Sequence, residues 1–244
     1  MTAPMLSVEE LTSGYGDSQV LFGMGFEVAA GEVVTLMGRN GMGKTTTVST
    51  VMGLVRPTGG TVLVEGEPVQ GLPPYRIAQR GLGLVPEGRQ VFPTLSVEEN
   101  LVATSANRRA GVARWTVESV VGLFPRLGER RRHLGGQLSG GEQQMLVIGR
   151  ALLTRPKLIT VDEPSLGLAP KIVDQVYEIL ERLRQEEGVT LLIVEQSTKR
   201  ALDHAERLYV LRSGMVQLEG RTADLSAADV ERAYFGFDEH AATA

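Results

Sequence analysis

Cysteine is absent from the 244-residue sequence, and other features that define common protein classes are missing too. Without cysteine the chain forms no disulfide, no thiolate zinc site and no cysteine nucleophile, which suits a reducing compartment. No uncharged apolar run approaches the roughly 18 residues of a membrane-spanning helix, and the N-terminus lacks the basic start and apolar stretch of a secretory signal. The formal net charge of −4 argues against a general nucleic-acid binder. We therefore expect a soluble, intracellular protein with a single core.

Short apolar segments alternate with helical stretches along most of the chain, which is the pattern of an α/β protein. Several apolar segments are continuous, as in strands that are covered on both faces. We expect strands at Glu32–Met37, Thr61–Glu65, Leu82–Pro86, Lys157–Asp162, Val189–Glu195 and Arg207–Arg212. We expect helices at Val97–Thr104, Thr116–Arg126, Gln143–Thr154 and Ala227–Tyr234, and a long one after Pro170.

The composition changes between about Leu95 and Gln137, where no clear strand occurs and seven arginines face four acidic residues. We interpret this part as a helical insertion rather than a separate domain. The sequence therefore predicts one domain over residues 1–244, with an α/β core at 1–94 and 157–244 and a helical subdomain at about 95–156.

A glycine-rich segment follows the first expected strand and precedes a helix that begins near Gly43. It matches G-x-x-x-x-G-K-[ST], in which backbone N–H groups surround the phosphates of a nucleoside triphosphate. Lys44 is expected to reach the β- and γ-phosphates, and the Thr45 hydroxyl to bind Mg²⁺. The alternative, a glycine-rich turn with a chance lysine, fits less well because strand and helix both flank the motif. The predicted phosphate-binding residues are Gly38, Arg39, Asn40, Gly41, Met42, Gly43, Lys44, Thr45 and Thr46.

Two adjacent carboxylates end the apolar strand Lys157–Asp162. Ligands of open α/β sheets bind outside the carboxyl ends of the strands. We expect Asp162 to hold Mg²⁺ and Glu163 to act as general base on an attacking water. Alone, such a pair is most simply the solvated start of a loop. Together with a phosphate loop, the functional interpretation is favoured.

A second glycine motif, Leu138-Ser139-Gly140-Gly141-Glu142, precedes the helix Gln143–Thr154. Ser139 and Glu142 have the spacing of a capping box. Gly140 and Gly141 would each cost about 1 kcal/mol relative to alanine in a first helical turn, and a cap does not need them. A backbone that approaches an anion closely does need glycines, so this helix start is a second candidate phosphate site.

These motifs together resemble the ATP-binding cassette (ABC) ATPases, and the resemblance covers essentially the whole chain. It implies a phosphate-loop core with a mainly parallel sheet, an antiparallel N-terminal β part and an α-helical insertion. It also implies ATP and Mg²⁺ as cofactors and a head-to-tail pair of cassettes. In such a pair, Ser139, Gly140, Gly141 and Glu142 of one cassette contact the ATP of the other. Tyr15 matches the aromatic residue that stacks on adenine, and Ser165–Leu168 matches the loop that crosses the interface.

Two positions depart from the general cassette pattern. Glu87, within Val85-Pro86-Glu87-Gly88-Arg89, stands where most cassettes have a glutamine near the magnesium and the membrane subunit. Gln196 stands where most have a histidine, and glutamine can hydrogen-bond a γ-phosphate or a water but cannot carry charge as imidazolium does. We expect Gln196 to act with Glu163 in catalysis, and Glu87 to lie at the metal.

The chain is also similar to the ATPase subunits of importers for branched-chain amino acids, amides and urea. Four segments carry this similarity: Val85–Arg89, Ser165–Pro170, Val194–Gln196 and the tail segment Ala233–Gly236. This similarity implies membrane permease subunits and a second ATPase subunit, usually a different cassette, although two copies of this chain remain an alternative. It implies an indirect link to an external substrate-binding protein, no nucleic-acid partner, and a cytoplasmic chain on the inner face of the membrane. A lipid exporter and a nucleotide-gated module that scarcely hydrolyses ATP are the alternatives. A cassette acting on DNA or ribosomes usually needs a long coiled-coil insertion or two cassettes in one chain, and this sequence has neither.

Overall fold

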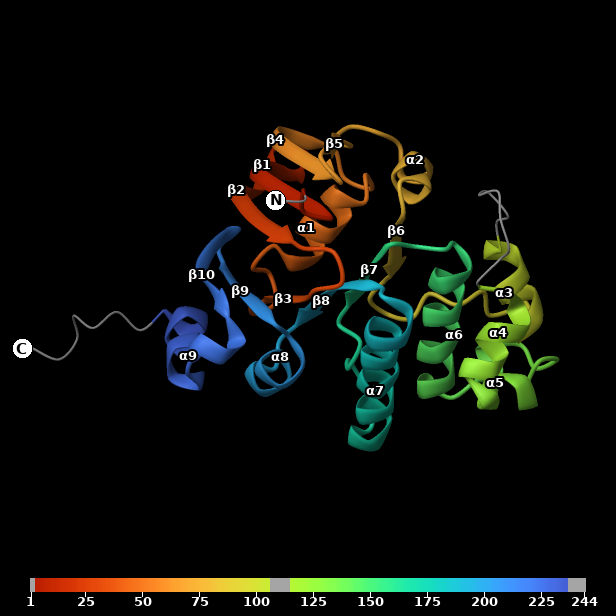
Figure 1. Ribbon diagram of the computed structural model, residues 1–244. Helices are drawn as coiled ribbons and strands as arrows, with labels where there is room; N and C mark the ends of the chain where they lie inside the picture. Colours follow the sequence, from red (N-terminus) through yellow and green to blue (C-terminus); the bar gives the residue numbers. More distant parts are fainter. Residues whose placement is uncertain (1–2, 106–114, 237–244) are drawn as a thin grey trace, which may run out of the picture. The chain divides into compact units, whose positions relative to one another are not determined.

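The computed structural model describes residues 3–105 and 115–236 of the chain (Figure 1). The contacts divide it into two compact units, one formed by Met1–Pro74 with Thr190–Ala244 and the other by Tyr75–Val189. The single domain with a helical part at 95–156, expected from the sequence, stays a prediction, and residues 106–114 of that part lie outside the described residues.

The first unit contains a four-stranded antiparallel sheet with the strand order β2-β1-β4-β5. Its strands are β1 (Leu6–Tyr15), β2 (Ser18–Val28), β4 (Pro57–Val64) and β5 (Glu67–Pro68). A two-residue turn joins β1 to β2, and Gly16 in that turn has a φ of 57°, which suits a tight hairpin. This sheet confirms the antiparallel N-terminal part that the family resemblance implied.

The same unit contains a second group of strands, in which β9 (Arg207–Arg212), β3 (Val33–Met37) and β8 (Thr190–Glu195) run parallel and β10 (Met215–Arg221) is antiparallel to β9. Every residue of β3 and β8 is buried, as continuous apolar runs predict. The helices of this unit are α1 (Lys44–Val51), α8 (Thr198–His204) and α9 (Ala227–Phe235). Met37, Ala201, Leu208, Val210 and Val230 form a buried cluster that packs α8 and α9 on these strands.

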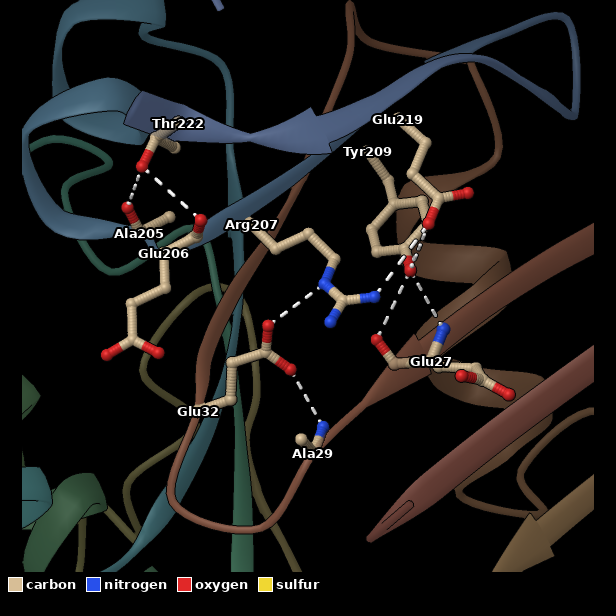
Figure 2. A network of polar contacts seen from close by, with 9 residues as sticks. All are labelled: Glu27, Ala29, Glu32, Ala205, Glu206, Arg207, Tyr209, Glu219 and Thr222. Carbon is tan, nitrogen blue, oxygen red and sulfur yellow. Dashed lines mark hydrogen bonds and ion pairs between the residues drawn. The ribbon is translucent and has the colours of Figure 1, made fainter. Parts of the chain in front are cut away.

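A partly buried polar network links β2, β9 and β10 to the residue before β3 (Figure 2). Arg207 Nε lies 2.9 Å from Glu32 Oε1. The Tyr209 hydroxyl accepts from the Glu27 N–H (3.1 Å) and donates to Glu219 Oε1 (3.1 Å). Burial raises the pKa of Tyr209, so this hydroxyl keeps its proton near neutral pH. The network gives hydrogen-bond partners to the buried Tyr209, as buried polar groups require, and to the half-buried Arg207. It also ties the edge of the antiparallel sheet to β9.

The second unit consists of one pair of parallel strands and a set of helices. The strands are β6 (Leu82–Val85) and β7 (Leu158–Asp162). The helices are α2 (Pro74–Gln79), α3 (Val97–Thr104), α4 (Val117–Leu123), α5 (Pro125–Glu129), α6 (Gly140–Leu153) and α7 (Pro170–Glu187), with a 3₁₀ turn at Gly135–Gln137. A Cβ at Gly149 would lie 2.7 Å from Val120 Cγ1, so this glycine lets α4 approach α6 closely.

Two helix predictions are wrong in detail. The single helix expected at Thr116–Arg126 is divided into α4 and α5, because Phe124 leaves the helical region (φ −120°, ψ 76°) before Pro125; a proline disfavours a helical residue before it. Helix α6 begins at Gly140 rather than Gln143, directly after its cap Ser139. Within residues 3–105 and 115–236, no helix combines the length and apolar character needed to cross a membrane.

Candidate functional site

The glycine-rich loop connects β3 to α1, as the sequence predicted. Gly41 (φ 81°) and Gly43 (φ 98°) adopt the left-handed conformation that favours glycine. Gly43 is the residue before α1, and among the described residues no side chain caps this helix. Arg39, Asn40 and Gly41 are exposed, and Met42 is half-buried. The first N–H groups of α1 and its positive dipole end therefore suit an anion such as a phosphate.

Lys44 is buried although it carries a charge, with only 4% of its surface exposed. Its ammonium donates to the carbonyl oxygens of Gly38 (2.7 Å) and Arg39 (3.0 Å), both within the loop. The phosphate loop therefore holds the ammonium that is predicted to bind the phosphates. Thr45 is exposed and Thr46 is buried, so the hydroxyl predicted to bind Mg²⁺ is accessible.

Two other predicted residues, Tyr15 and Gln196, belong to the same unit as the loop. Tyr15 ends β1 and is 53% exposed, which excludes a core tyrosine and leaves the ring available for stacking. Gln196 follows β8 directly, and the parallel register pairs Met37 with Glu195. The glycine loop and Gln196 therefore leave neighbouring strands at the same edge. The buried Glu195 carboxylate accepts from the Gln196 N–H at 2.9 Å and fixes the backbone there.

The acidic residues Asp162 and Glu163 lie in the second unit, at the carboxyl end of β7. Asp162 is 3% exposed, whereas Glu163 is half-buried and has a φ of 49°. A non-glycine residue in this region costs on the order of 1–3 kcal/mol, and such residues cluster at functional sites. The register pairs Val85 with Val161, so the exposed Glu87 leaves the sheet at the same edge as this acidic pair.

The predicted capping box at the start of α6 is confirmed. Glu142 Oε2 accepts from the N–H and from the hydroxyl of Ser139, each at 2.8 Å, and the Ser139 hydroxyl accepts from the Glu142 N–H at 3.4 Å. Glu142 Oε1 lies 2.8 Å from Arg130 Nε. Burial acts to raise the pKa of the Glu142 carboxyl, but the hydrogen bonds from Ser139 and the charge of Arg130 outweigh burial. The pKa therefore lies below its ordinary value, and Glu142 is ionised.

The structure adds a reason for the two glycines of this motif that the sequence did not reveal. A Cβ on Gly141 would lie 2.6 Å from Ile172 Cγ2, and one on Gly140 would lie 2.8 Å from Arg89 Nη1. Both positions are therefore packed closely by residues of the same unit, whatever else approaches them. Arg89 had no assigned role, and its only signal was its place beside Glu87 in a motif shared with the importer ATPases.

The predicted ligands of Mg²⁺ are Thr45, Asp162 and Glu87, which all offer oxygen donors, the type that this ion prefers. In the described part of the chain, no three His, Asp or Glu side chains form a cluster that could hold a metal ion. Magnesium is commonly bound by one or two carboxylates together with substrate phosphates. Thr45 belongs to the first unit and Asp162 and Glu87 to the second, so the predicted ligand set stays a prediction.

Parallel strands with a glycine-rich loop between a strand and a helix are the arrangement of the P-loop nucleoside triphosphatases. The sequence profile of the family described as "ABC transporter" matches residues 21–166, and the chain belongs to this family. It is thus an ATPase of the ABC class.

Three curated relatives match the chain along nearly its full length. BraG, a "high-affinity branched-chain amino acid transport ATP-binding protein" of Pseudomonas aeruginosa, is 45% identical over 95% of this chain and 100% of its own. LivF of Archaeoglobus fulgidus, a "probable branched-chain amino acid transport ATP-binding protein", is 31% identical over 91% of this chain and 94% of its own. LptB of Haemophilus influenzae, a "lipopolysaccharide export system ATP-binding protein", is 34% identical over 95% and 97%.

Solved structures agree with the family assignment. A nucleotide-free ATP-binding cassette from an ABC transporter superposes with a TM-score of 0.84 at 25% identity, covering 97% of this chain and 100% of its own. The cassette MJ0796, solved as a dimer in a post-hydrolysis state with ADP and Pi, superposes with a TM-score of 0.78 at 25% identity over 89% and 99%. The fold class expected from the sequence is therefore confirmed.

Proposed function

We propose that this chain is the ATP-hydrolysing subunit of an importer for branched-chain amino acids or related amides and urea. The observation that carries this proposal is the full-length similarity to BraG at 45% identity. The phosphate loop supports it, because Arg39, Asn40 and Gly41 in that loop are exposed. ATP binding closes a pair of cassettes, hydrolysis reopens it, and separate membrane subunits convert the motion into transport.

Each predicted site residue has one role in this proposal. Tyr15 stacks on the adenine, and the residues Gly38–Thr46 surround the phosphates. Lys44 exchanges the neutral carbonyl oxygens of the loop for charged phosphate oxygens, so both partners of the new hydrogen bond are ionised and the contact is stronger than the one it replaces. Thr45, Asp162 and Glu87 hold Mg²⁺, which neutralises phosphate charge when bound. Glu163 accepts a proton from the attacking water, and Gln196 orients that water or the γ-phosphate.

The second cassette supplies the other side of the nucleotide. Ser139, already the cap of α6, and the N–H groups of Gly140, Gly141 and Glu142 contact the γ-phosphate of the ATP held by the partner chain. Closure depends on ATP because only the closed state offers these contacts, and a ligand shifts an equilibrium only through unequal affinity for its two states. The partner is a different cassette or a second copy of this chain.

The remaining partners follow from the same assignment. Permease subunits in the membrane receive the motion through the segment around Glu87, and an external substrate-binding protein acts on those permeases. The chain itself lies on the cytoplasmic face as a peripheral subunit and contacts no nucleic acid.

The test of this function uses the complex recovered from detergent-solubilised membranes with this chain as bait. The membrane subunits are identified, and the complex is returned to vesicles that contain ATP, with the external substrate-binding protein and its ligand added outside. We expect the wild-type complex to take up leucine, an amide or urea. We expect no uptake by the complex that carries Glu163→Gln. Uptake and turnover that are equal in both complexes would remove the assignment, and would favour a module that is gated by nucleotide without hydrolysing it.

A lipid exporter is the second candidate, because LptB is 34% identical over most of both chains. The same preparation separates the two functions. Membrane subunits that stimulate ATP turnover when lipopolysaccharide is added, and not when leucine and its binding protein are added, would favour export over import.

A further inference from the structure

Arg89 lies where three predicted motifs of the second unit meet. Its Nη2 donates to the carbonyl oxygens of Leu166 (2.8 Å) and Gly167 (3.1 Å), which belong to the segment Ser165–Leu168. Its Nη1 lies against Gly140, where a Cβ would approach to 2.8 Å. The Arg89 backbone itself follows Glu87 by two positions. One side chain therefore contacts the second phosphate motif and the expected interface loop, and begins at the segment expected to face the membrane subunit.

The guanidinium makes these contacts in place of an ion pair. In the described part of the chain no carboxylate pairs with Arg89, and its hydrogen bonds go to the two carbonyls. A charged donor forms a stronger hydrogen bond than a neutral one, and the planar fork of arginine suits two acceptors at fixed positions better than an ammonium does. The loop that receives these bonds is otherwise closed by turns, from the Leu166 N–H to the Glu163 carbonyl (3.2 Å) and from the Leu168 N–H to the Ser165 carbonyl (3.3 Å).

The backbone at Arg89 is held in an uncommon conformation. Arg89 and Gln90 have φ values of 66° and 30°, both in the region that favours glycine. The carbonyl of Gln90 accepts from Arg150 Nη1 at 2.8 Å. Strained residues persist only where the surrounding structure holds them in place. Here Arg150 holds the backbone of Gln90 in place, and the carbonyls of Leu166 and Gly167 hold the side chain of Arg89.

We propose that Arg89 is a positioning residue, which fixes the Ser165–Leu168 loop and the start of α6 in the arrangement that receives the ATP of the partner cassette. This inference rests on the proposed function. Glu163 lies two positions before that loop, and its carbonyl accepts from the Leu166 N–H in one of the turns that close the loop. A loop that loses Arg89 therefore also loses part of the support for Glu163. The contacts of Arg89 lie entirely within the second unit, whereas the phosphate loop belongs to the first. Arg89 therefore acts on turnover and on pairing, and not on the binding of ATP to its own phosphate loop.

The test compares kcat and KM for ATP in the purified transporter complex carrying Arg89→Ala, Arg89→Lys or Arg182→Ala. Arg182 is a matched control, an arginine of the same unit whose ion pair with Glu186 is exposed. We expect Arg89→Ala to lower kcat roughly 10- to 100-fold, the range that a small misplacement of reacting groups produces, while KM and the melting temperature stay near wild type. Arg89→Lys keeps the charge but not the planar fork, so its kcat should fall less than that of Arg89→Ala. If the alanine variant fails to fold, the lysine variant still tests whether kcat falls while KM stays unchanged. Arg182→Ala should behave as wild type.

Three results would overturn the inference. A kcat within about twofold of wild type in Arg89→Ala would show that the contacts do not support turnover. A parallel loss of ATP affinity, or a lower melting temperature with proportional loss of activity, would show a general structural role instead. Absence of turnover in the wild-type complex would overturn the proposed function itself, and this inference with it.

Discussion

Glu142 binds Ser139 through a single carboxylate oxygen, which lies 2.8 Å from both the backbone nitrogen and the hydroxyl of the serine. The residue predicted to contact the partner's ATP is therefore held by its own helix before any nucleotide arrives. Because Arg130 holds the other oxygen of Glu142 at 2.8 Å, the serine is positioned by an ionised and anchored group.

This arrangement predicts separate effects on stability and function for Ser139→Ala. Losing the cap of α6 should cost about 1 kcal/mol of unfolding free energy, measurable by urea denaturation. Ser226→Ala is the control, because Ser226 caps α9 through the same kind of box with Asp229 and should cost a similar amount. Only Ser139→Ala should abolish ATP-dependent pairing. Equal pairing in the two variants would contradict a role for Ser139 beyond its helix.

The lowered pKa of Glu142 predicts a pH dependence with a definite sign. A carboxyl whose folded pKa lies below its unfolded value contributes stability that is present above the unfolded value and lost as pH falls through the folded one. The unfolded value is about 4.5, so the contribution should be complete at neutral pH and disappear below that value. Glu142→Gln keeps the box without the charge. The difference in unfolding free energy between wild type and this variant should therefore shrink as the pH falls from 7 to 3. A difference that stays constant would contradict a stabilising role for the Glu142 charge.

The close packing of Gly141 predicts coupling between two positions. Gly141→Ala places a methyl group 2.6 Å from Ile172 Cγ2, which should destabilise the chain by about 1–3 kcal/mol. Ile172→Ala removes that atom, so the double variant should be more stable than the sum of the two losses predicts. Urea denaturation of all four proteins measures the coupling energy. Additivity within about 0.5 kcal/mol would show that the glycine is not required by this contact.

Lys44→Ala should weaken ATP binding roughly 10- to 100-fold, the effect of a lost hydrogen bond from a charged group. Equilibrium binding to the purified chain measures it. Lys199→Ala is the control, since Lys199 is exposed on α8 in the same unit. Unchanged ATP affinity in the Lys44 variant would count against the phosphate-loop assignment.

The parts of the fold that the sequence predicted well are those with uniform burial. β7, β8 and β9 appear within a residue of their predicted bounds, because strands buried on both faces produce continuous apolar runs. β1, β2 and β10 carry polar residues between their apolar ones, and register irregularities interrupt their pairing. Such strands leave a weak pattern, and the antiparallel part was reached only through the family resemblance.

The candidate site shows the same division between local and distant information. The phosphate loop and the capping box are short motifs whose physics is contained within eight residues or fewer, so they could be recognised directly. Arg89 could not, because its acceptors are backbone carbonyls 77 and 78 positions away. A backbone carbonyl is present at every residue, so no sequence pattern marks the one that a distant arginine reaches.

The central claim is that one ATP site is completed by two chains, and the Glu163→Gln variant tests it most directly. With its general base removed, the protein should still bind ATP and Mg²⁺ but should not reopen. Light scattering on size-exclusion chromatography should then give the mass of two cassettes, either of this chain alone or of this chain with the second cassette recovered with it, and Ser139→Ala in the same background should restore single cassettes. Single cassettes at saturating ATP, with the nucleotide bound, would contradict the account.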